Sequence, residues 1–352
     1  MNLADTIAGV LWLGTMLYAV FGGADFGAGV WDLVAGRRTG AAAQHDLIDR
    51  AVGPVWEVNH TWLIFDLVIL WSAFPDAFAA ITSTLYLPLA LAAAGIVLRG
   101  AGFAFRKVSH RLTGRRLFGL TFALSSVVTP FFLGTALGAI ASGRVPPDGG
   151  GDPIGSWLNP TSVAVGLLAV AAGAYIAGAF LTADARRSDL SLVDAFRRRT
   201  LAAGIVAGGL AIAGLFVLRV DAPMLFADLT GAGLPFVAGS VVAGSMSLVL
   251  CVVADGRWTR AFAVAAVATV VLGWGAAQYP LLLPPDLTIA AAAAPEGTLQ
   301  ALLVITIVAV VVIGPSIAWL LRLHQGSRLE SKPEAGPPLN REPRPPQPWR
   351  GS

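Results

Sequence analysis

Apolar runs of roughly 20 residues alternate with short polar stretches along most of the chain, and a helix of that length crosses a hydrocarbon layer about 30 Å thick. Nine such runs are present, at 5–27, 58–80, 81–104, 117–141, 161–183, 200–219, 232–254, 259–281 and 299–322. Between the second and third runs only Ser72–Asp76 marks a turn, with Pro75 as its helix breaker. The pattern predicts an all-α polytopic membrane protein with nine transmembrane helices.

Composition supports the same interpretation. The 352 residues are 56% hydrophobic and 13% charged, which is too little charge to cover the surface of a water-soluble fold. The net charge of +3 comes from basic residues in short loops, so no binding to nucleic acid is expected. The single cysteine, Cys251, excludes a disulfide within the chain. The N-terminus lacks the basic residues of a cleaved signal peptide, so the first span is expected to stay.

The basic residues predict the orientation. With the N-terminus outside, the inner segments hold 21 of the 24 Lys and Arg residues. The outer loops hold only Arg144 and Arg219, while Arg99 lies within the third span. Basic residues gather on the cytoplasmic side of membrane proteins, so we expect the N-terminus outside and the C-terminus in the cytoplasm. The inner segments of this scheme are 28–56, 105–116, 184–199, 255–258 with Arg260, and the tail with Arg322.

Two regions follow from the pattern. Residues 1–323 are expected to form the transmembrane domain. Residues 324–352 are polar and rich in proline, and they lack the apolar side chains that a packed core needs. We expect a disordered cytoplasmic tail there, with peptide recognition by its prolines as the weaker alternative.

Polar side chains within the spans are the candidates for chemistry. The second span carries Glu57, Asn59, His60 and Asp66. A carboxylate at the centre of a membrane helix costs about 2.5–3.5 kcal/mol on insertion scales, so such residues are rare and usually functional. No P-loop, no His/Cys cluster with metal spacing and no nucleophile–base arrangement occurs in the sequence.

Three ionisable groups are expected to meet near the cytoplasmic side. Asp25 is near the inner end of the first span, Glu57 at the start of the second and Arg99 near the inner end of the third. Burial favours the neutral form of a carboxylate and a nearby arginine favours the charged form. A carboxylate balanced between the two can take up and release protons, so these residues predict a proton pathway.

Simpler interpretations stay open for several of these residues. Asp25 could cap a helix end, and a helix dipole would favour Glu57 in a first turn without any function. Arg106 is interpreted as an anchor whose side chain reaches the interface, while for Arg99 anchoring and function are equally weighted. Asp66 is either a deeper proton station or a residue paired across a helix interface.

Histidine and tryptophan add little chemistry on their own. His60 is interpreted as a hydrogen-bonding partner rather than a haem ligand, because no second axial ligand is recognisable near it. No metal or haem is therefore expected in this chain alone. Trp56 and Trp62 are interpreted as interface or aromatic-belt residues.

Four segments resemble one family. They are ADFGAGVWDL (24–33), GPVWEVNHTWLIFDLVILWSAFPDAFA (53–79), LRGAGFAFRK (98–107) and AQYPLLLPPDLT (277–288). In order and content they are similar to subunit II of cytochrome bd quinol oxidase, particularly its cyanide-insensitive branch. The resemblance implies nine spans arranged as two four-helix bundles plus a peripheral helix, in the bacterial cytoplasmic (inner) membrane.

The resemblance also implies partners and a reaction. In such complexes subunit I binds two b haems and one d haem and oxidises quinol, and the complex reduces oxygen to water. Subunit II, without haem, supports subunit I and supplies part of a proton pathway from the cytoplasm. A small single-helix subunit, and membrane lipid or quinone bound to the chain, are further partners that the sequence leaves open.

The resemblance transfers to particular residues. Asp25, Glu57, Asn59 and Arg99 match the polar positions of the family motifs. Phe21-Gly22-Gly23 stands where members often carry a second acid, and Glu57 replaces an aspartate, so the exact proton route stays open. The alternative function is a proton-coupled secondary transporter, which would also keep carboxylates and an arginine in its spans. A third interpretation is a purely scaffolding subunit with structural acids.

Overall fold

The computed structural model describes residues 2–36, 40–108, 112–253 and 256–325. Side chains are also left undescribed at 52–58, 107–108, 112–113, 115–116, 313, 317–318 and 320–325. The chain divides into two units, residues 1–304 and 305–352. The described part of the second unit is the remainder of one helix, and the predicted tail lies almost wholly outside the described residues.

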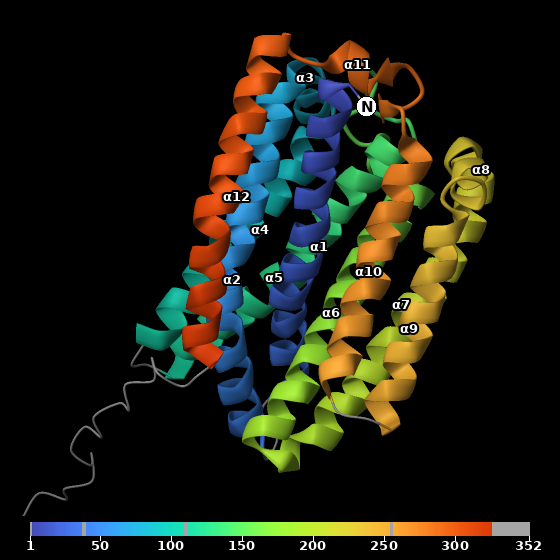
Figure 1. Ribbon diagram of the computed structural model, residues 1–352. Coiled ribbons are helices and arrows are strands. Elements are labelled where there is room, and N and C mark those ends of the chain that lie inside the picture. The colour runs from blue at the N-terminus through green and yellow to red at the C-terminus, as the bar shows by residue number, and fades with distance from the viewer. Residues whose placement is uncertain (1, 37–39, 109–111, 254–255, 326–352) are drawn as a thin grey trace, which may run out of the picture. The chain divides into compact units, whose positions relative to one another are not determined.

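Helices make up nearly all of the described chain (Figure 1). The long ones are α1 (Leu3–Ala35), α2 (Ala41–Ala73), α4 (Tyr86–Val108), α5 (Leu112–Ala141), α6 (Pro160–Ser188), α7 (Val193–Asp221), α9 (Leu234–Val253), α10 (Gly256–Gln278) and α12 (Glu296–Gln325). The short ones are α3 (Pro75–Thr84), α8 (Pro223–Thr230), α11 (Ile289–Ala292) and the 3₁₀ turn η1 (Leu190–Leu192). A small antiparallel pair, β1 (Leu281–Leu283) and β2 (Leu287–Thr288), is the departure from an all-α fold.

The predicted number of spans agrees with the structure when one bent pair counts as a single span. Eight described helices are long and apolar enough to cross a membrane alone, and the ninth span is Asn59–Ala73 together with α3, bent by 117°. The predicted turn at Ser72–Asp76 is confirmed, because the helix breaks at Phe74, and the third span begins at Tyr86 rather than at 81. Pro75 lacks a backbone N–H and pushes the preceding residue out of the helical region, to φ −137° and ψ 61°.

The first inner segment, 28–56, was expected to be a loop, and most of it is helix. α1 continues to Ala35 and α2 already begins at Ala41. Hydropathy marks only the lipid-spanning part of a helix, whereas the backbone hydrogen bonds continue into the polar flank. These extensions carry polar side chains that belong to the site described below.

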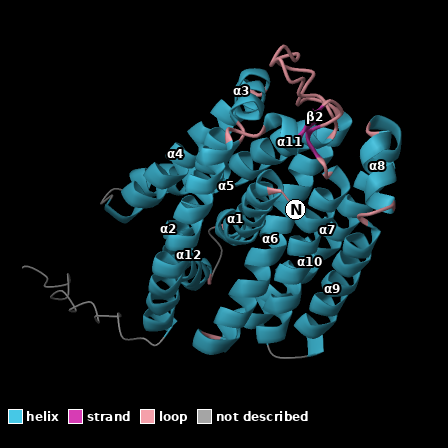
Figure 2. Ribbon diagram, turned by 45° about the horizontal axis from the view of Figure 1, so that its top comes forward, coloured by secondary structure: helices cyan, strands magenta, loops and turns pink. Residues whose placement is uncertain are grey.

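The first unit contains two halves of similar plan. α1 packs against α2 and α5 in the first half, and α6 packs against α7 and α10 in the second. α4 pairs with α5, and α9 pairs with α10. α1 and α6 also pack against each other, and Figure 2 shows α1 enclosed by α2, α5 and α6. This arrangement confirms the predicted two bundles of four long helices.

The contact between α1 and α6 depends on glycine. A Cβ atom on Gly27 would lie 2.0 Å from the carbonyl oxygen of Gly173, closer than any real contact. Glycine at this position therefore lets the two backbones touch, as small residues do between membrane helices. The crossing fixes where the polar residues of α1 lie relative to the second half.

The two halves also share a helix break. Ala222, which precedes Pro223, has φ −140° and ψ 65°, nearly the angles of Phe74 before Pro75. In both halves the proline starts a short helix that leads into the next long one. When the two halves are aligned along the sequence so that Phe74 corresponds to Ala222, the first residue of α4 corresponds to the first residue of α9.

Candidate functional site

A buried ion pair joins α1 to α4. Nη1 of Arg99 donates to Oδ2 of Asp25 at 2.7 Å, and Nη2 donates to Oδ1 at 2.8 Å. Each of the two residues is 1% exposed. Two parallel N–H···O bonds give an arginine–carboxylate pair both strength and a fixed orientation. Asp25 lies well inside α1, which rules out the helix-capping interpretation.

Further polar groups complete the cluster. Nδ2 of Asn59, also 1% exposed, donates to Oδ2 of Asp25 at 3.3 Å. Nε of Arg99 donates to Oγ of Ser126 at 2.9 Å, and Nη2 donates to the backbone carbonyl of Asp25 at 2.8 Å. The predicted meeting of Asp25, Asn59 and Arg99 is therefore present, and it includes Ser126 of α5, which the sequence analysis did not single out.

A second ion pair lies two helical turns away on the same two helices. Nη1 of Arg106 donates to Oδ2 of Asp32 at 2.8 Å, and Nη2 contacts Asp49. The Arg106 side chain is 14% exposed and is held by these two acids, which the anchor interpretation did not include. The extended helices α1 and α2 bring the two acids to it. The shared spacing of seven, Asp25 to Asp32 and Arg99 to Arg106, was the available sequence signal.

His45 joins this second pair. Its Nδ1 lies 2.5 Å from Oδ1 of Asp32, and its Nε2 lies 3.0 Å from the carbonyl oxygen of Gly36. The hydrogen bond to Asp32 raises the pKa of His45 above its ordinary value of 6.5, although partial burial opposes the change. The sequence analysis did not single out His45, because the helical start of α2 was not recognised.

Asp66 lies against α1 rather than toward lipid. A Cβ atom on Gly14 would lie 2.0 Å from Oδ1 of Asp66, so the glycine makes room for the carboxyl group. That oxygen is buried and has no hydrogen-bond partner among the described residues. The structure thus places Asp66 at the interface between α2 and α1, and both roles named for it stay predictions.

The remaining candidates on α2 are described only in part. The side chains of Trp56 and Glu57 lie outside the described residues, so their predicted roles stay predictions. His60 is partly buried and has interactions with its surroundings. Trp62 makes an edge contact with Phe65, at 6.1 Å between ring centroids.

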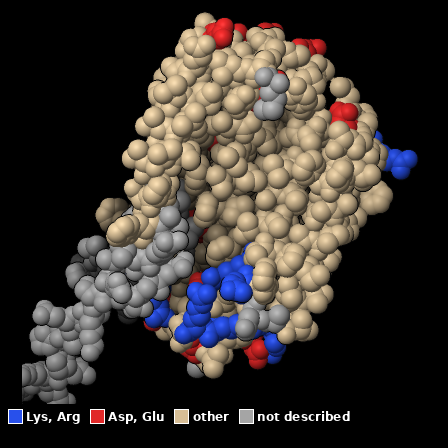
Figure 3. Space-filling view, viewed as in Figure 1, with Lys and Arg blue, Asp and Glu red and all other residues tan. Residues whose placement is uncertain are grey.

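Charge is distributed unevenly along the helices. In Figure 3 most of the visible Lys and Arg gather at the lower end, where α6 and α7 connect, and acids dominate the upper end. Arg144, one of the two predicted outer exceptions, is paired with Asp221 at 2.8 Å. This distribution agrees with the alternation on which the predicted orientation depends.

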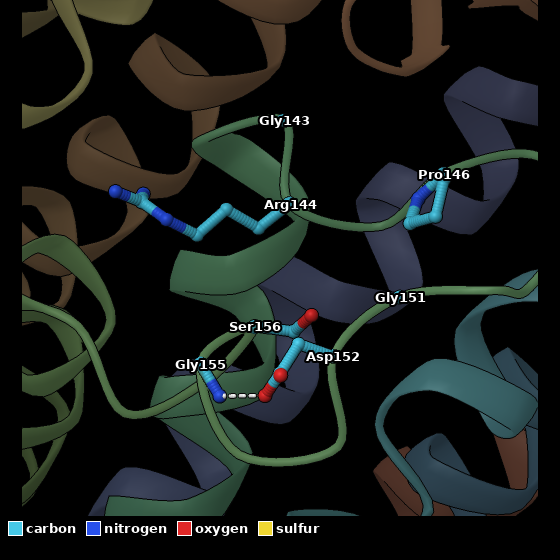
Figure 4. A pocket seen from close by; sticks show the side chains of 7 residues that line it. All are labelled: Gly143, Arg144, Pro146, Gly151, Asp152, Gly155 and Ser156. Atoms are coloured by element: carbon cyan, nitrogen blue, oxygen red, sulfur yellow. Dashed lines mark hydrogen bonds between the residues drawn. The ribbon is translucent and has the colours of Figure 1, made fainter.

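A shallow hollow of about 330 Å³ lies on the loop between α5 and α6, far along the chain from the buried pairs (Figure 4). Its lining includes Arg144, Asp152 and Ser156. The backbone N–H groups of Gly155 and Ile154 donate to Asp152 and lower its pKa. Those bonds satisfy the carboxylate within its own turn, so the hollow offers little chemistry for a ligand.

Side chains that commonly ligate metal ions are not grouped in the described residues. No group of three His, Cys, Asp or Glu residues is arranged to hold a metal in the described part of the chain. Both ring nitrogens of His45 face other acceptors, which leaves no lone pair directed at an iron atom. The donor set present here suits proton exchange and ion pairing.

Comparisons with known proteins converge on one family. The family model described as cytochrome bd terminal oxidase subunit II matches residues 3–324. Cytochrome bd-I ubiquinol oxidase subunit 2 of Escherichia coli (strain K12) is 28% identical over 137 residues, 39% of this chain and 35% of that protein. Cytochrome bd ubiquinol oxidase subunit 2 of Bacillus subtilis (strain 168) is 29% identical over 113 residues, 32% of each chain. The aligned stretches thus span about a third of these curated relatives.

A solved structure extends the likeness over the whole membrane part. One chain of the bd oxidase from Geobacillus thermodenitrificans matches with a TM-score of 0.77 at 26% identity. The match covers 92% of this chain and 98% of that one. The similarity therefore includes both halves of the bundle, not only the segments that carry the sequence motifs.

Proposed function

Since this chain belongs to the family of cytochrome bd terminal oxidase subunit II, we propose that it serves as the haem-free subunit of a bd-type quinol oxidase in the bacterial cytoplasmic membrane. Its partner is a haem-bearing subunit I, and the complex oxidises quinol and reduces oxygen to water. The chain itself supplies part of the path that carries protons from the cytoplasm. The supporting observation is the cluster of Asp25, Asn59 and Arg99, sealed between α1, α2 and α4.

The cluster has the parts that a proton path needs. Buried charges in a membrane helix are retained at a cost, and in such positions they usually serve ion or proton movement. If Asp25 takes up a proton, Arg99 keeps two acceptors that do not titrate, Ser126 and the carbonyl of Asp25. These two hydrogen bonds would still hold the guanidinium in place, although its charge would lose its counterion.

Glu57 and Asp66 extend the proposed path along α2. Glu57 stands two positions before Asn59 in the sequence, at the side of the cluster nearer to the Lys- and Arg-rich end. Asp66 stands seven positions after Asn59 and lies against α1 at Gly14. Two carboxyl groups on either side of the ion pair would let a proton pass from one end of the segment to the other.

The haems and the quinol belong to the partner and to the complex as a whole. They supply electron transfer and oxygen reduction, while the residues of this chain hold and move protons. Hydrogen bonds within this chain occupy the polar side chains of His45, Asn59 and Arg99. This supports a chain that lies beside a haem-bearing subunit and gives no ligand to its haems.

The rival interpretation, a proton-coupled transporter, is less well supported. Transporters bind substrate at the membrane midplane, next to discontinuous helices. The breaks at Phe74 and Ala222 follow the long helices α2 and α7, in sequence segments predicted to face outward. The buried charges instead lie on α1 and α4, which are continuous helices.

The first test replaces Glu57 by Gln in the complex purified with its partner. We expect oxygen consumption with quinol to fall by roughly tenfold or more, since a general acid–base group contributes at least that much, while the haem spectrum stays intact. Asp76→Asn, which neutralises an exposed acid on α3, is the matched control and should change neither.

The same purification tests the assignment itself. The tagged chain should bring down a haem-bearing partner with visible absorbance. A colourless chain that transports a solute alone would contradict the proposed function. Unchanged turnover in Glu57→Gln, with the partner present, would instead remove Glu57 from the path and leave the scaffolding interpretation.

A further inference from the structure

Two acid–arginine ion pairs connect α1 to α4, one after the other along the two helices. Asp25 pairs with Arg99, and Asp32 pairs with Arg106. Seven residues separate the members on each helix, which is about two turns and about 10.5 Å of helical rise. We call the Asp25–Arg99 pair, which is fully buried, the inner rung. We call the Asp32–Arg106 pair, which lies nearer to the Lys- and Arg-rich end of the bundle, the outer rung.

One aromatic ring lies between the two rungs. The guanidinium carbon of Arg99 is 4.7 Å from the centroid of Phe122, and that of Arg106 is 5.2 Å from it. Such contacts hold a cation over a ring without neutralising it. Phe122 therefore helps to orient both arginines.

His45 contacts Asp32 of the second ion pair and is partly exposed to solvent. Its side chain is 31% exposed, whereas that of Asp32 is 4% exposed, so His45 is the group of the pair that water reaches. Both of its ring nitrogens face oxygen acceptors, Asp32 and the carbonyl of Gly36. Only the protonated ring has two N–H donors, so this arrangement fits a histidine that carries a proton.

We propose that His45 and Asp32 form a proton-loading site, at which a proton from the cytoplasm enters this chain on its way to the Asp25 cluster. The proposal rests on the proposed function, because it takes the Lys- and Arg-rich end as the cytoplasmic side. It assigns His45 and Asp32 roles that the family motifs did not suggest.

The transfer is a simple proton exchange. A hydronium ion at the surface protonates the ring and is left as water, and the cationic His45 donates through Nδ1–H to Oδ1 of Asp32. When the proton moves, the N–H bond breaks and an O–H bond forms, leaving a neutral ring and a neutral carboxyl group. Nε2–H stays on the carbonyl of Gly36, and Arg106 keeps its contact with Asp49. The proton on Asp32 is then two turns from Asp25.

The surrounding charges are compatible with a site that both gains and loses a proton. The acids near His45 are Asp32 on α1 and Asp46 and Asp49 on α2, and the opposing cation is Arg106 on α4. Gln44, next to His45 in sequence, binds the guanidinium of Arg199 from α7. The hydrogen bond to Asp32 favours the charged ring and raises the pKa of His45, while partial burial and Arg106 oppose this change.

The test uses the complex with its partner, in which oxygen consumption is measured with quinol from about pH 6 to about pH 9, where histidine titrates. His45→Gln keeps a donor to Asp32 but cannot titrate. We expect turnover to fall roughly tenfold at neutral pH and the inflection due to His45 to disappear, with haem content unchanged. Asp194→Asn, which neutralises an exposed acid at the start of α7, is the control.

A purely structural role for His45 would give a different result. If His45 only holds the helix ends together, His45→Gln changes the yield or the melting temperature equally at every pH and leaves turnover per haem the same, which overturns the proposal. Should His45→Gln fail to assemble, His45→Lys keeps the ion pair with Asp32 but does not release a proton near neutral pH. Normal turnover in His45→Lys also overturns it.

The proposed function fails separately. A wild-type complex without a haem-bearing partner, or one that consumes no oxygen with quinol, contradicts the assignment as an oxidase subunit. A wild-type complex that is active while both His45 variants retain the wild-type pH profile contradicts only the loading site.

Discussion

The first half of the bundle, α1–α5, and the second half, α6–α10, share a backbone plan but differ in what they bury. When the two halves are aligned along the sequence so that Phe74 corresponds to Ala222, Arg99 corresponds to Ser247 and Asn59 to Ala207. Where α1 meets α6, the close glycines Gly23 and Gly173 are followed two positions later by Asp25 and Tyr175. The charged cluster thus has a neutral counterpart.

Charge burial is confined to one half. Among the described residues, the buried charged side chains are Asp25, Asp32 and Arg99, all in the first half. In the second half Ser247 donates to a backbone carbonyl of Thr259 at 3.0 Å, and Arg260 meets Asp184 near the basic end. The same arrangement of helices folds without an internal ion pair, so the fold does not explain why the first half keeps one.

The halves also differ in which of their long helices contact one another. α7 packs against α9, whereas α2 and α4 make only sparse contact in the described part of the chain. The first half therefore depends more on the links that pass through α1, and the two ion pairs from α1 to α4 are among them. Disrupting these pairs is the direct way to test what separates the halves.

The largest effect is expected from Arg99→Ala. It leaves Asp25 as a buried acid without its partner, and breaking a buried pair in this way costs about 3–5 kcal/mol. We expect a large loss of assembled complex and a lower melting temperature, measured on the purified complex. A variant that assembles and melts like the wild type would show that the pair does not hold the first half together.

A smaller effect on folding is expected when both charges are removed together. Asp25→Asn combined with Arg99→Gln makes the Asp25–Arg99 cluster neutral, as the corresponding positions Tyr175 and Ser247 of the second half are. Replacing a buried ion pair by neutral groups is often nearly neutral for stability. The double variant should recover most of the assembly that Arg99→Ala loses, as judged by yield and melting temperature. A double variant no better than the single one would contradict the comparison.

The smallest effect is expected in the second half. Ser247→Ala removes one hydroxyl that donates to a backbone carbonyl, which costs about 0.5–1.5 kcal/mol. Oxygen turnover per haem should stay at the wild-type value, because no buried charge is altered. A fall in turnover comparable to that of Glu57→Gln would place proton movement in the second half as well.

Sequence reasoning identified the inner rung and missed the outer one for a definite reason. Asp25, Asn59 and Arg99 are polar residues within apolar runs, and consecutive spans are neighbours, so their meeting was predictable. Asp32 and Arg106 lie beyond the apolar runs, where hydropathy predicts loop. Only the continuation of α1 and α4 as helices brings these two residues onto the same faces as Asp25 and Arg99.

The likeness of the two halves could not be predicted from residue types. Asn59 and Ala207, or Arg99 and Ser247, share no chemistry, so no repeat was visible in the sequence. The shared signal is the proline at Pro75 and Pro223, and one proline in each half is too little to establish a duplication. The backbone angles at Phe74 and Ala222 reveal it.

Proton uptake by the Asp25→Asn, Arg99→Gln double variant, reconstituted with its partner in vesicles, tests the central claim most directly. The account predicts a complex with a normal haem spectrum whose uptake of protons and consumption of oxygen both fall by roughly tenfold or more. Normal uptake and turnover in that variant would contradict the claim that the buried charges of the first half carry protons.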